Sequence, residues 1–233
     1  MREADAYLKS RSFPGGYEII VANSASRDRT AEIVKNMQPQ IVGLRLLNLE
    51  NKGKGWAVKQ GMLEAQGEIR LFSDADNSVS PEQADKFLSL VCNTSSIESS
   101  STTAGCFDVV IGSIAMPGAV IEEKARWYRR VLGRLSKYVI RIISGLWGIR
   151  DSQRGFKFFS KKAADIIFSR LTVLTWGFDI EALLIAKRRG LKVKELPVHW
   201  VNPSDSKVGL GSYFSTLLEL LQIKWNDLRG FYR

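Results

Sequence analysis

The stretch Leu71-Phe72-Ser73-Asp74-Ala75-Asp76-Asn77-Ser78 decides the fold prediction. An apolar run ends in two carboxylates one residue apart, and Ser80-Pro81-Glu82 then predicts the start of a helix. Alternate residues of a strand share a face, so Asp74 and Asp76 are expected to point the same way where the strand ends. Two hard oxygen ligands at that position suit a divalent ion that also holds phosphates. The alternative is an acidic turn that caps the next helix, because Asp, Asn and Ser favour such positions.

The segments on either side of this stretch predict strands and helices in alternation. Strands are expected at 17–22, at 41–48, before Asp74 and at 107–113, and helices at 28–37, 55–65 and 81–91. This order predicts a parallel sheet with right-handed crossovers. Loops that follow parallel strands meet at one edge of the sheet, where ligands bind. We therefore expect the Asn23-Ser24 loop, the Lys52/Lys54 loop and the carboxylates to converge.

The two ends of the chain predict further helices. Residues 1–16 are typical of a short amphipathic helix that ends at the Pro14-Gly15-Gly16 turn. In the second half, the segment 151–157 leads into a strand, and a helix to Arg189, a strand at 191–201 and an apolar-faced helix at about 211–228 follow.

Composition limits the class of protein. At 233 residues, one α/β domain is expected. The net charge of +10 favours an anionic partner such as nucleic acid, phosphates or an acidic membrane surface. Cys92 and Cys106 form no metal-ligand pattern, so a reduced, intracellular setting is expected. The sequence has no apolar stretch long enough to span a bilayer and no secretory signal at its N-terminus.

Most of the positive excess lies in residues 122–170, which contain thirteen Lys/Arg and four Asp/Glu. Apolar residues, Trp127 and Tyr138 among them, interleave with these charges at helical spacing. Such helices suit an anionic membrane surface. Surface helices with solvated arginines and a core-facing stripe remain the alternative. The pattern matches no DNA- or RNA-reading module, so nucleic acid is not an expected partner.

With these segments in order, the chain resembles the family 2 glycosyltransferases, and within them the dolichyl-phosphate (polyprenyl-phosphate) glucosyltransferases. The resemblance covers residues 17–233. Its motifs are YEIIVANSASRDRT, NKGKGWAVKQGML, FSDADNS, VVIGSIAMPGA, DSQRGFKFF, WGFDIEALLIAKRRG and VHWVNPSDSKV.

The resemblance implies a GT-A (Rossmann-like) α/β fold, with a mainly parallel sheet flanked by helices. It implies one domain over 1–233, with a nucleotide-sugar-binding half at 17–114 and an acceptor half at 115–233 whose amphipathic helices face a membrane. The implied reaction moves a hexose, with inversion, onto a polyprenyl or dolichyl phosphate, in the service of protein glycosylation. The donor most like the family's is UDP-glucose, with GDP-mannose as the alternative. The implied location is peripheral, at the cytoplasmic face of a membrane.

The resemblance also implies roles for particular residues. Mg²⁺ or Mn²⁺ would be held by Asp76 with help from Asp74, and Asp76 and Asp151 would be the catalytic carboxylates. The remaining implied residues are Asn23, Ser24, Lys54, Asp74 and Lys207 for the donor, Arg126, Arg129 and Arg130 for the acceptor phosphate, and Gln153, Trp176, Asp179 and Glu181 as further motif positions. The chemistry agrees, because a leaving diphosphate needs charge neutralisation. An acceptor phosphate with a second pKa of about 6 needs no strong base, which fits a chain with one histidine.

The chain departs from the family pattern in three places. The family opens with a strand and a nucleotide-wrapping loop, whereas this sequence starts at the helix that follows, which predicts a missing strand and an exposed sheet edge. Ser24 stands where an Asp is expected to bind the uracil ring. Ile114 replaces the arginine of a Gly-Ser-Arg motif. A truncated or non-catalytic nucleotide-sugar-binding relative is therefore the alternative hypothesis.

Overall fold

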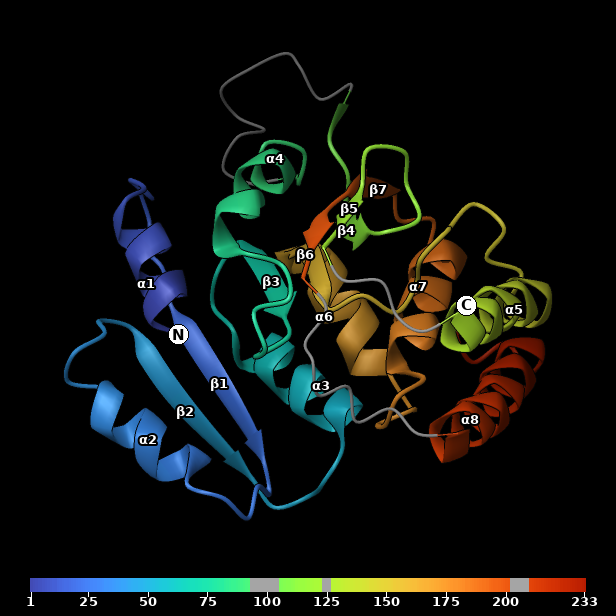
Figure 1. The fold of residues 1–233 in the computed structure, drawn as a ribbon, viewed down its shortest axis with the longest axis horizontal. Helices are drawn as coiled ribbons and strands as arrows, with labels where there is room; N and C mark the ends of the chain where they lie inside the picture. Colours follow the sequence, from blue (N-terminus) through green and yellow to red (C-terminus); the bar gives the residue numbers. More distant parts are fainter. Residues whose placement is uncertain (93–104, 123–126, 202–209) are drawn as a thin grey trace.

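A four-stranded sheet in the order β3-β6-β4-β7 forms the centre of the computed structural model, which describes residues 1–92, 105–122, 127–201 and 210–233 (Figure 1). The sheet consists of β3 (Ile69–Ser73), β6 (Phe156–Ser160), β4 (Val109–Ser113) and β7 (Val193–Pro197). Two smaller sheets are parallel pairs, β1 (Ile19–Ser24) with β2 (Leu44–Leu49) and β5 (Val120–Ile121) with β8 (His199–Trp200).

The helices occur close to where the sequence predicts them. They are α1 (Arg2–Lys9), α2 (Thr30–Met37), α3 (Lys54–Glu64), α4 (Asp85–Leu88), α5 (Trp127–Ser144), α6 (Lys161–Arg170), α7 (Phe178–Arg188) and α8 (Leu210–Leu228). The helix expected at 81–91 is instead a 3-10 turn, η1 (Pro81–Ala84), followed by the short α4. No helix in the described ranges is long and apolar enough to cross a membrane.

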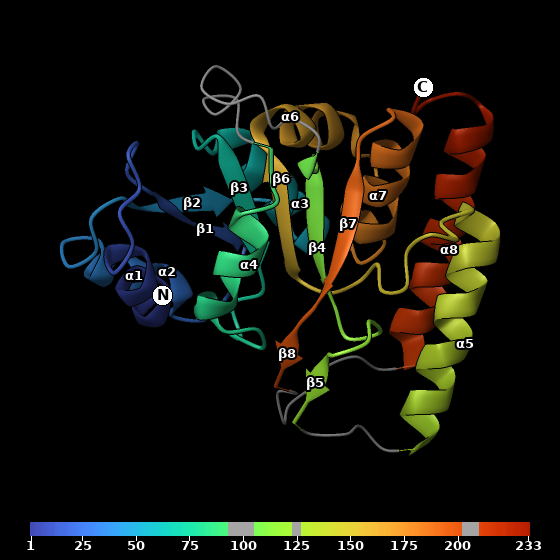
Figure 2. The same cartoon turned by 90° about the horizontal axis from the view of Figure 1, so that it is seen from above.

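The prediction of one parallel sheet made from the first four strands is wrong in its pairing. β1 and β2 pair with each other, and β6 lies between β3 and β4, antiparallel to both. The prediction assumed that a crossover helix precedes each strand and keeps it parallel to the last. Instead, the chain leaves the C-terminal end of α5 and enters β6 in the direction opposite to β3 and β4 (Figure 2). Three of the five strand pairings described are nevertheless parallel, so a mainly parallel α/β fold is confirmed.

Strand β6 organises the core. Its sequence Phe-Lys-Phe-Phe-Ser is buried at every position. Because side chains alternate along a strand, Phe158 packs on one face with Phe87 of α4, and Phe159 packs on the other with Phe168 of α6. Helix α7, buried from Phe178 to Ala186, completes the second of these layers.

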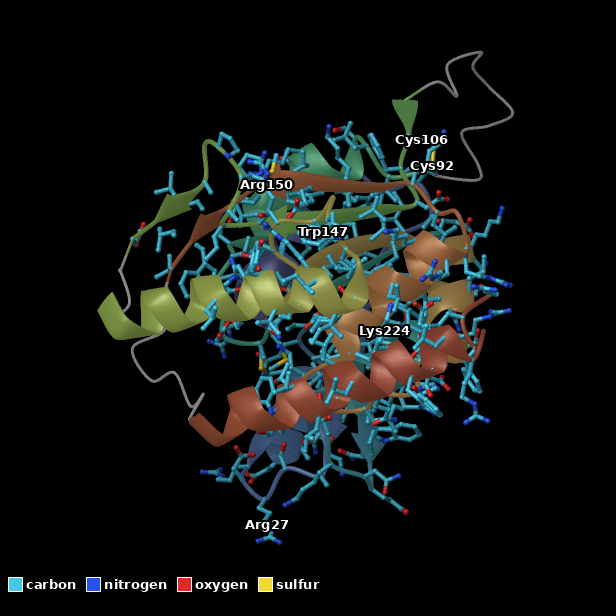
Figure 3. The ribbon with its side chains drawn as sticks, turned by 90° about the vertical axis from the view of Figure 1, so that its right-hand side faces the viewer. Arg27, Cys92, Cys106, Trp147, Arg150 and Lys224 are labelled. Carbon is cyan, nitrogen blue, oxygen red and sulfur yellow. A yellow bond between two sulfur atoms is a disulfide. The ribbon has the colours of Figure 1, made fainter. Side chains whose placement is uncertain are left out.

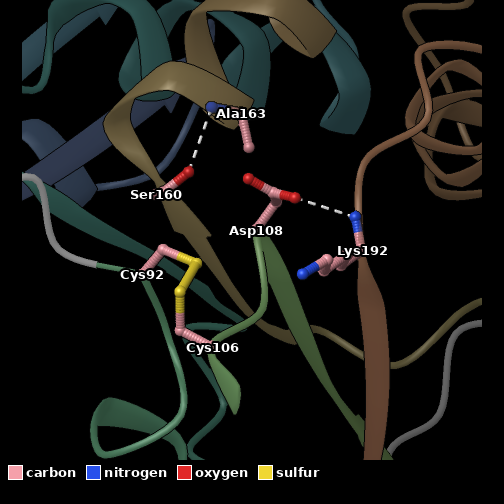
Figure 4. The surroundings of a disulfide bond; sticks show 6 residues. All are labelled: Cys92, Cys106, Asp108, Ser160, Ala163 and Lys192. Carbon is pink, nitrogen blue, oxygen red and sulfur yellow. Dashed lines mark hydrogen bonds between the residues drawn. A yellow bond between two sulfur atoms is a disulfide. The ribbon is translucent and has the colours of Figure 1, made fainter. Parts of the chain in front are cut away.

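The expectation that the two cysteines are reduced is wrong for this structure. Cys92 and Cys106 form a disulfide with their Cα atoms 5.0 Å apart (Figure 4). The bond lies at the amino end of β4, near Asp108, whose carboxylate accepts a hydrogen bond from the Lys192 backbone N–H at 2.8 Å. The sequence argument considered only metal-ligand spacing and compartment. It did not anticipate that an isolated bridge from Val91 to Phe107 brings the two cysteines together.

Removing the disulfide should destabilise the fold. The bond closes a loop with a sequence separation of 14, and cross-links of that span contribute about 3 kcal/mol through the unfolded chain. The double substitution Cys92→Ser, Cys106→Ser should lower the free energy of urea unfolding by about this amount. Alkylation of the native protein without reductant should label neither thiol. Two labelled thiols and an unchanged unfolding curve would contradict the assignment.

Candidate functional site

Asp74, the first residue beyond β3, lies between a lysine and a glycine. Its Oδ1 is 2.8 Å from Nζ of Lys54, and its backbone N–H donates to the Gly155 carbonyl at 3.0 Å. A Cβ added at Gly155 would lie 2.2 Å from the Asp74 carboxylate. A side chain at position 155 would therefore displace the Asp74 carboxylate from its observed position.

Asp76 lies in the turn that follows, beyond the end of the strand. Its side chain is exposed, and Oδ1 accepts a hydrogen bond from the Ser78 backbone N–H at 3.0 Å. The shared-face argument applies only within a strand, and β3 ends at Ser73. Asp76 thus stabilises its own turn, but it does not cap η1, whose N-cap is Ser80 without a side-chain cap hydrogen bond. Metal binding by Asp76 stays a prediction. Within the described ranges no group of three or more His, Cys, Asp or Glu is arranged to hold a metal.

The Asn51-Lys52-Gly53-Lys54-Gly55 loop brings Lys54 to Asp74. Gly53 has φ of 146°, and a Cβ there would lie 2.3 Å from the Leu174 carbonyl oxygen. The Trp56 backbone N–H donates to that same oxygen at 2.9 Å, which docks the first turn of α3 against the 174–175 segment. Lys54 then lies 5.6 Å from the ring centres of both Phe72 and Trp176.

Hydrogen bonds join the end of β1 to the same loop. The Ser24 hydroxyl donates to the Asn51 carbonyl at 2.7 Å and accepts from the Gly53 backbone N–H at 2.9 Å. The Asn23 side chain instead donates to Asn48 on β2 at 3.0 Å. The predicted convergence of the β1 loop, the lysine loop and Asp74 is therefore confirmed.

A buried ion pair lies behind Asp74. Lys157 on β6 and Asp179 at the start of α7, both almost wholly buried, are 2.5 Å apart. Burial raises the pKa of the Asp179 carboxyl, an effect that the charges of Lys157 and Lys54 reduce and the charge of Asp74 reinforces. The charged groups Lys54, Asp74, Asp179 and Lys157 thus form one coupled set.

A second buried carboxylate, Asp151, lies four residues before Gly155 in the chain. Its side chain is 1% exposed, and its Oδ2 contacts Lys137 Nζ at 3.0 Å and Arg154 Nε at 3.3 Å. Burial raises the pKa of Asp151, but the charges of Arg154 and Lys137 outweigh burial and hold it below its usual value. The carboxylate is therefore ionised and oriented at neutral pH.

Comparison with known proteins shows the family of this chain. The model of the family described as "Glycosyl transferase family 2" matches residues 6–168, which is well over half of the chain.

The chain belongs to glycosyl transferase family 2.

Named relatives agree with this assignment. The chain is 37% identical over 225 residues to "Dolichyl-phosphate beta-glucosyltransferase ALG5C" of Trichomonas vaginalis, a match that covers 95% of this chain and 64% of that protein. It is 30% identical to the "Dolichyl-phosphate beta-glucosyltransferase" of Homo sapiens, with 100% of this chain and 72% of that protein covered. The chain thus spans just under two thirds of the first of these relatives.

Solved structures support the fold. A crystal structure of glucosyl-3-phosphoglycerate synthase from Mycobacterium tuberculosis, in complex with Mn²⁺, UDP and phosphoglyceric acid, superimposes with a TM-score of 0.58 at 16% identity. The match covers 95% of this chain and 74% of that one. At this identity the likeness concerns the fold alone, which is of the GT-A type predicted from the sequence.

The remaining motif positions of this family 2 chain have different surroundings. Glu181 is fully buried and accepts hydrogen bonds from the Thr172 and Val173 backbone N–H groups and from the Tyr232 hydroxyl, so it anchors the core behind the site. Trp176 is 46% exposed near Lys54, and Gln153 is exposed beside Arg154.

The arginines predicted to bind the acceptor, and Lys207, predicted to bind the donor, lie beyond what the structure describes in full. Arg126 and Lys207 fall in the ranges 123–126 and 202–209, outside the described residues. Arg129 and Arg130 lie on α5, but their side chains are outside the described part. Their roles stay predictions. Ile114, at the position of the missing arginine, packs against the core.

Sequence reasoning missed Gly155, Lys157 and Arg154 as site residues. Lys157 could have been noticed, because a lysine inside the apolar run Phe156–Phe159 needs a buried partner. Gly155 and Arg154 gave no such signal, since their importance depends on the antiparallel placement of β6 beside Asp74.

The Asp151 carboxylate should make folding stability sensitive to acid. Its pKa is lower in the folded chain than the unfolded value of about 3.9, so it contributes stability above that pH, and the contribution is lost as the pH falls through the folded-state pKa. Asp151→Asn should cost about 2 kcal/mol at neutral pH. The difference from the native protein should shrink in acid below the unfolded pKa.

Urea unfolding across this pH range measures the effect. Glu82→Gln, which changes an exposed carboxylate of η1, is the matched control and should be neutral throughout. A difference between Asp151→Asn and native protein that stays constant into acid would contradict the argument.

Proposed function

We propose that this chain transfers a hexose, glucose from UDP-glucose, onto a polyprenyl or dolichyl phosphate, with inversion at the anomeric carbon. The observation that carries the proposal is the meeting of Asp74, Lys54 and the Ser24-bound loop at the carboxyl edge of the strands, where ligands bind in α/β folds. The names of the relatives support the sugar and the acceptor.

Asp74 and Asp76 would hold the divalent cation, Mg²⁺ or Mn²⁺, that such a donor requires. The residues fit this role: both are carboxylates within one turn, and the bare Cα of Gly155 leaves room for the Asp74 carboxylate. The Lys54 ammonium, 2.8 Å from Asp74, shows that this carboxylate already attracts a cation. Neighbours of the same fold crystallised with Mn²⁺ and UDP-glucose support the choice of ion. When bound, the ion neutralises the leaving diphosphate.

Residues of this chain would bind the diphosphate and orient the acceptor. Lys54, held between Asp74 and two aromatic rings, is placed to contact the diphosphate. The acceptor phosphate is already an anion at neutral pH and needs no strong base to attack. Asp151, ionised and fixed by two cations, would orient groups on the acceptor side.

The acceptor half has a surface suited to a membrane. Helices α5 and α8 lie side by side on one face of the molecule (Figure 3). Exposed large apolar side chains occur on these helices and just beyond their C-terminal ends: Leu135, Tyr138, Ile142, Trp147, Leu217, Leu218, Leu221, Trp225, Leu228 and Phe231. We call this set the α5/α8 apolar face. Helix α5 contains five Lys/Arg and no acidic residue.

Apolar helix faces flanked by cations bind anionic bilayers. The α5/α8 apolar face would place the chain at the surface that holds its lipid acceptor. The cytoplasmic face of a membrane is the proposed location, and a cytosol that reduces disulfides would act on the Cys92–Cys106 bond there.

A non-catalytic nucleotide-sugar-binding protein is the second candidate. One observation favours it: the Ser24 hydroxyl, at the position expected to bind the nucleotide base, is engaged with backbone groups of the lysine loop. Such a protein would bind UDP without turnover.

Transfer of radiolabelled glucose from UDP-glucose to a polyprenyl phosphate tests the function. Asp76→Asn keeps the hydrogen-bond acceptor for Ser78 but removes the charge, so we expect the rate to fall about a hundredfold or more. Glu82→Gln, at an exposed carboxylate six residues further along the chain, should retain the native rate. Equal rates in the two variants would remove Asp76 from the mechanism.

Two further measurements distinguish the two candidate functions and the two possible donors. UDP binding in calorimetry without any transfer would favour the non-catalytic protein. Faster transfer from GDP-mannose than from UDP-glucose would assign the other donor.

Vesicle flotation tests the membrane surface. The double substitution Leu218→Glu, Trp225→Glu should reduce binding to vesicles of phosphatidylcholine and phosphatidylserine by about tenfold or more, because two exposed apolar side chains become charged. Val42→Glu, at an exposed apolar residue outside α5 and α8, is the control and should bind as the native protein does. If all three proteins float equally, the α5/α8 apolar face is not the contact.

A further inference from the structure

Two cations are held on one buried carboxylate in the acceptor half. Lys137 Nζ and Arg154 Nε both contact Oδ2 of Asp151, at 3.0 and 3.3 Å. Because they share one oxygen, they are close enough for a single phosphate to touch both. The side chains of Lys137 and Arg154 remain 29% and 28% exposed, whereas that of Asp151 is 1% exposed. The cations therefore face solvent while their carboxylate does not.

Arg154 is fixed from a second side. Its guanidinium carbon lies 4.5 Å from the ring centre of Trp200 on β8. A guanidinium has five N–H donors in a planar fork, and the contact with Asp151 uses its Nε. Stacking and the ion pair together set the direction of the remaining donors, so little rotamer entropy is left to lose when an anion binds.

The charge around this pair favours an anion. The Asp151 carboxylate balances one of the two cations. Glu195, a further acid, accepts hydrogen bonds from the backbone N–H groups of Arg150 and Asp151 at 2.8 Å. Arg141 lies one turn from Lys137 on α5 and donates to the carbonyls of Ile149 and Arg150. Arg150, whose carbonyl accepts one of these hydrogen bonds, has an exposed side chain and is labelled in Figure 3.

We propose that Lys137 and Arg154, oriented by Asp151, form the seat of the acceptor phosphate. This inference rests on the proposed function and assigns the acceptor to residues other than the three arginines predicted from the sequence. We call the two cations and Asp151 the phosphate clamp.

The position of the phosphate clamp suits a transfer between two ligands. Arg154 directly precedes Gly155, whose backbone carbonyl accepts the Asp74 N–H at 3.0 Å. The backbone that carries Arg154 is therefore adjacent to the segment of Asp74, the carboxylate proposed to hold the donor's cation. In the chain, Lys137 directly precedes Tyr138, whose exposed side chain belongs to the α5/α8 apolar face. A phosphate on the clamp would have apolar surface for its tail.

Binding of farnesyl phosphate and of farnesol, measured by titration calorimetry on the full chain, isolates the contribution of the phosphate. The native protein should bind farnesyl phosphate at least about tenfold more tightly than farnesol. Lys137→Gln and Arg154→Gln should each lose most of this preference, while Arg154→Lys should keep part of it. The affinity for UDP should be unchanged in all three variants. Lys161→Gln, at an exposed lysine paired with Glu68, is the matched control and should keep the native preference.

The measurements separate the clamp from its alternatives. If Arg154→Gln keeps the native phosphate preference while the double variant Arg129→Gln, Arg130→Gln loses it, the clamp is overturned in favour of the arginines predicted from the sequence. If the clamp variants lose UDP affinity and thermal stability together with the phosphate preference, the pair is structural and the proposal is again overturned. A native protein that transfers no glucose and shows no preference for farnesyl phosphate would contradict the proposed function itself.

Discussion

The structure depends on the close passage of β6 beside Asp74. Gly155 has no side chain, so the Asp74 carboxylate has room to contact Lys54. The Asp74 backbone N–H also donates a hydrogen bond to the Gly155 carbonyl at the entry to β6. Any larger residue at Gly155 would occupy the position of the carboxylate. Lys54 is in turn held by the docking of α3 on the 174–175 segment. Three segments far apart in sequence thus meet at Asp74, and the 174–175 segment supports one of them.

The same strand joins two charged centres. The segment from Asp151 to Gly155 begins at the ion pair of Asp151 with Arg154 and ends beside Asp74. Two residues further along the chain, Lys157 pairs with the buried Asp179. Cations and carboxylates alternate along this path, which keeps buried charges paired, as low-dielectric surroundings require. The centre near Asp74 suits a nucleotide sugar and its cation, and the centre near Asp151 suits an anionic acceptor. The short distance along the chain between them gives the two proposed substrates a common, rigid support.

The sequence predicted local structure well and non-local pairing less well. The strand at Ile19–Ser24, the helix after Gly53 and the carboxylate turn after Ser73 follow from apolar periodicity and glycine signals. Family motifs led to Asp74 and Lys54, and their contact is observed. The antiparallel insertion of β6 could not be read from periodicity, because a buried strand looks the same in either direction.

The misses among the site residues share that cause. Gly155 and Arg154 become important only because β6 lies beside β3. The disulfide between Cys92 and Cys106 likewise depends on a pairing between residues far apart in the chain. Asp76 shows the converse case: a strand argument predicted the direction of its side chain, but the strand had ended one residue before Asp74.

The most direct test of the central claim is the Mn²⁺ dependence of UDP binding, measured by calorimetry on Gly155→Ala. The added methyl group would displace the Asp74 carboxylate, so the gain in UDP affinity on adding Mn²⁺ should fall by about tenfold or more, while the affinity without metal stays native. Gly148→Ala, at a glycine whose added Cβ would meet nothing within 4 Å, should behave as the native protein does. A Gly155→Ala protein with the full native gain from Mn²⁺ would show that Asp74 and its contact with β6 do not hold the cation.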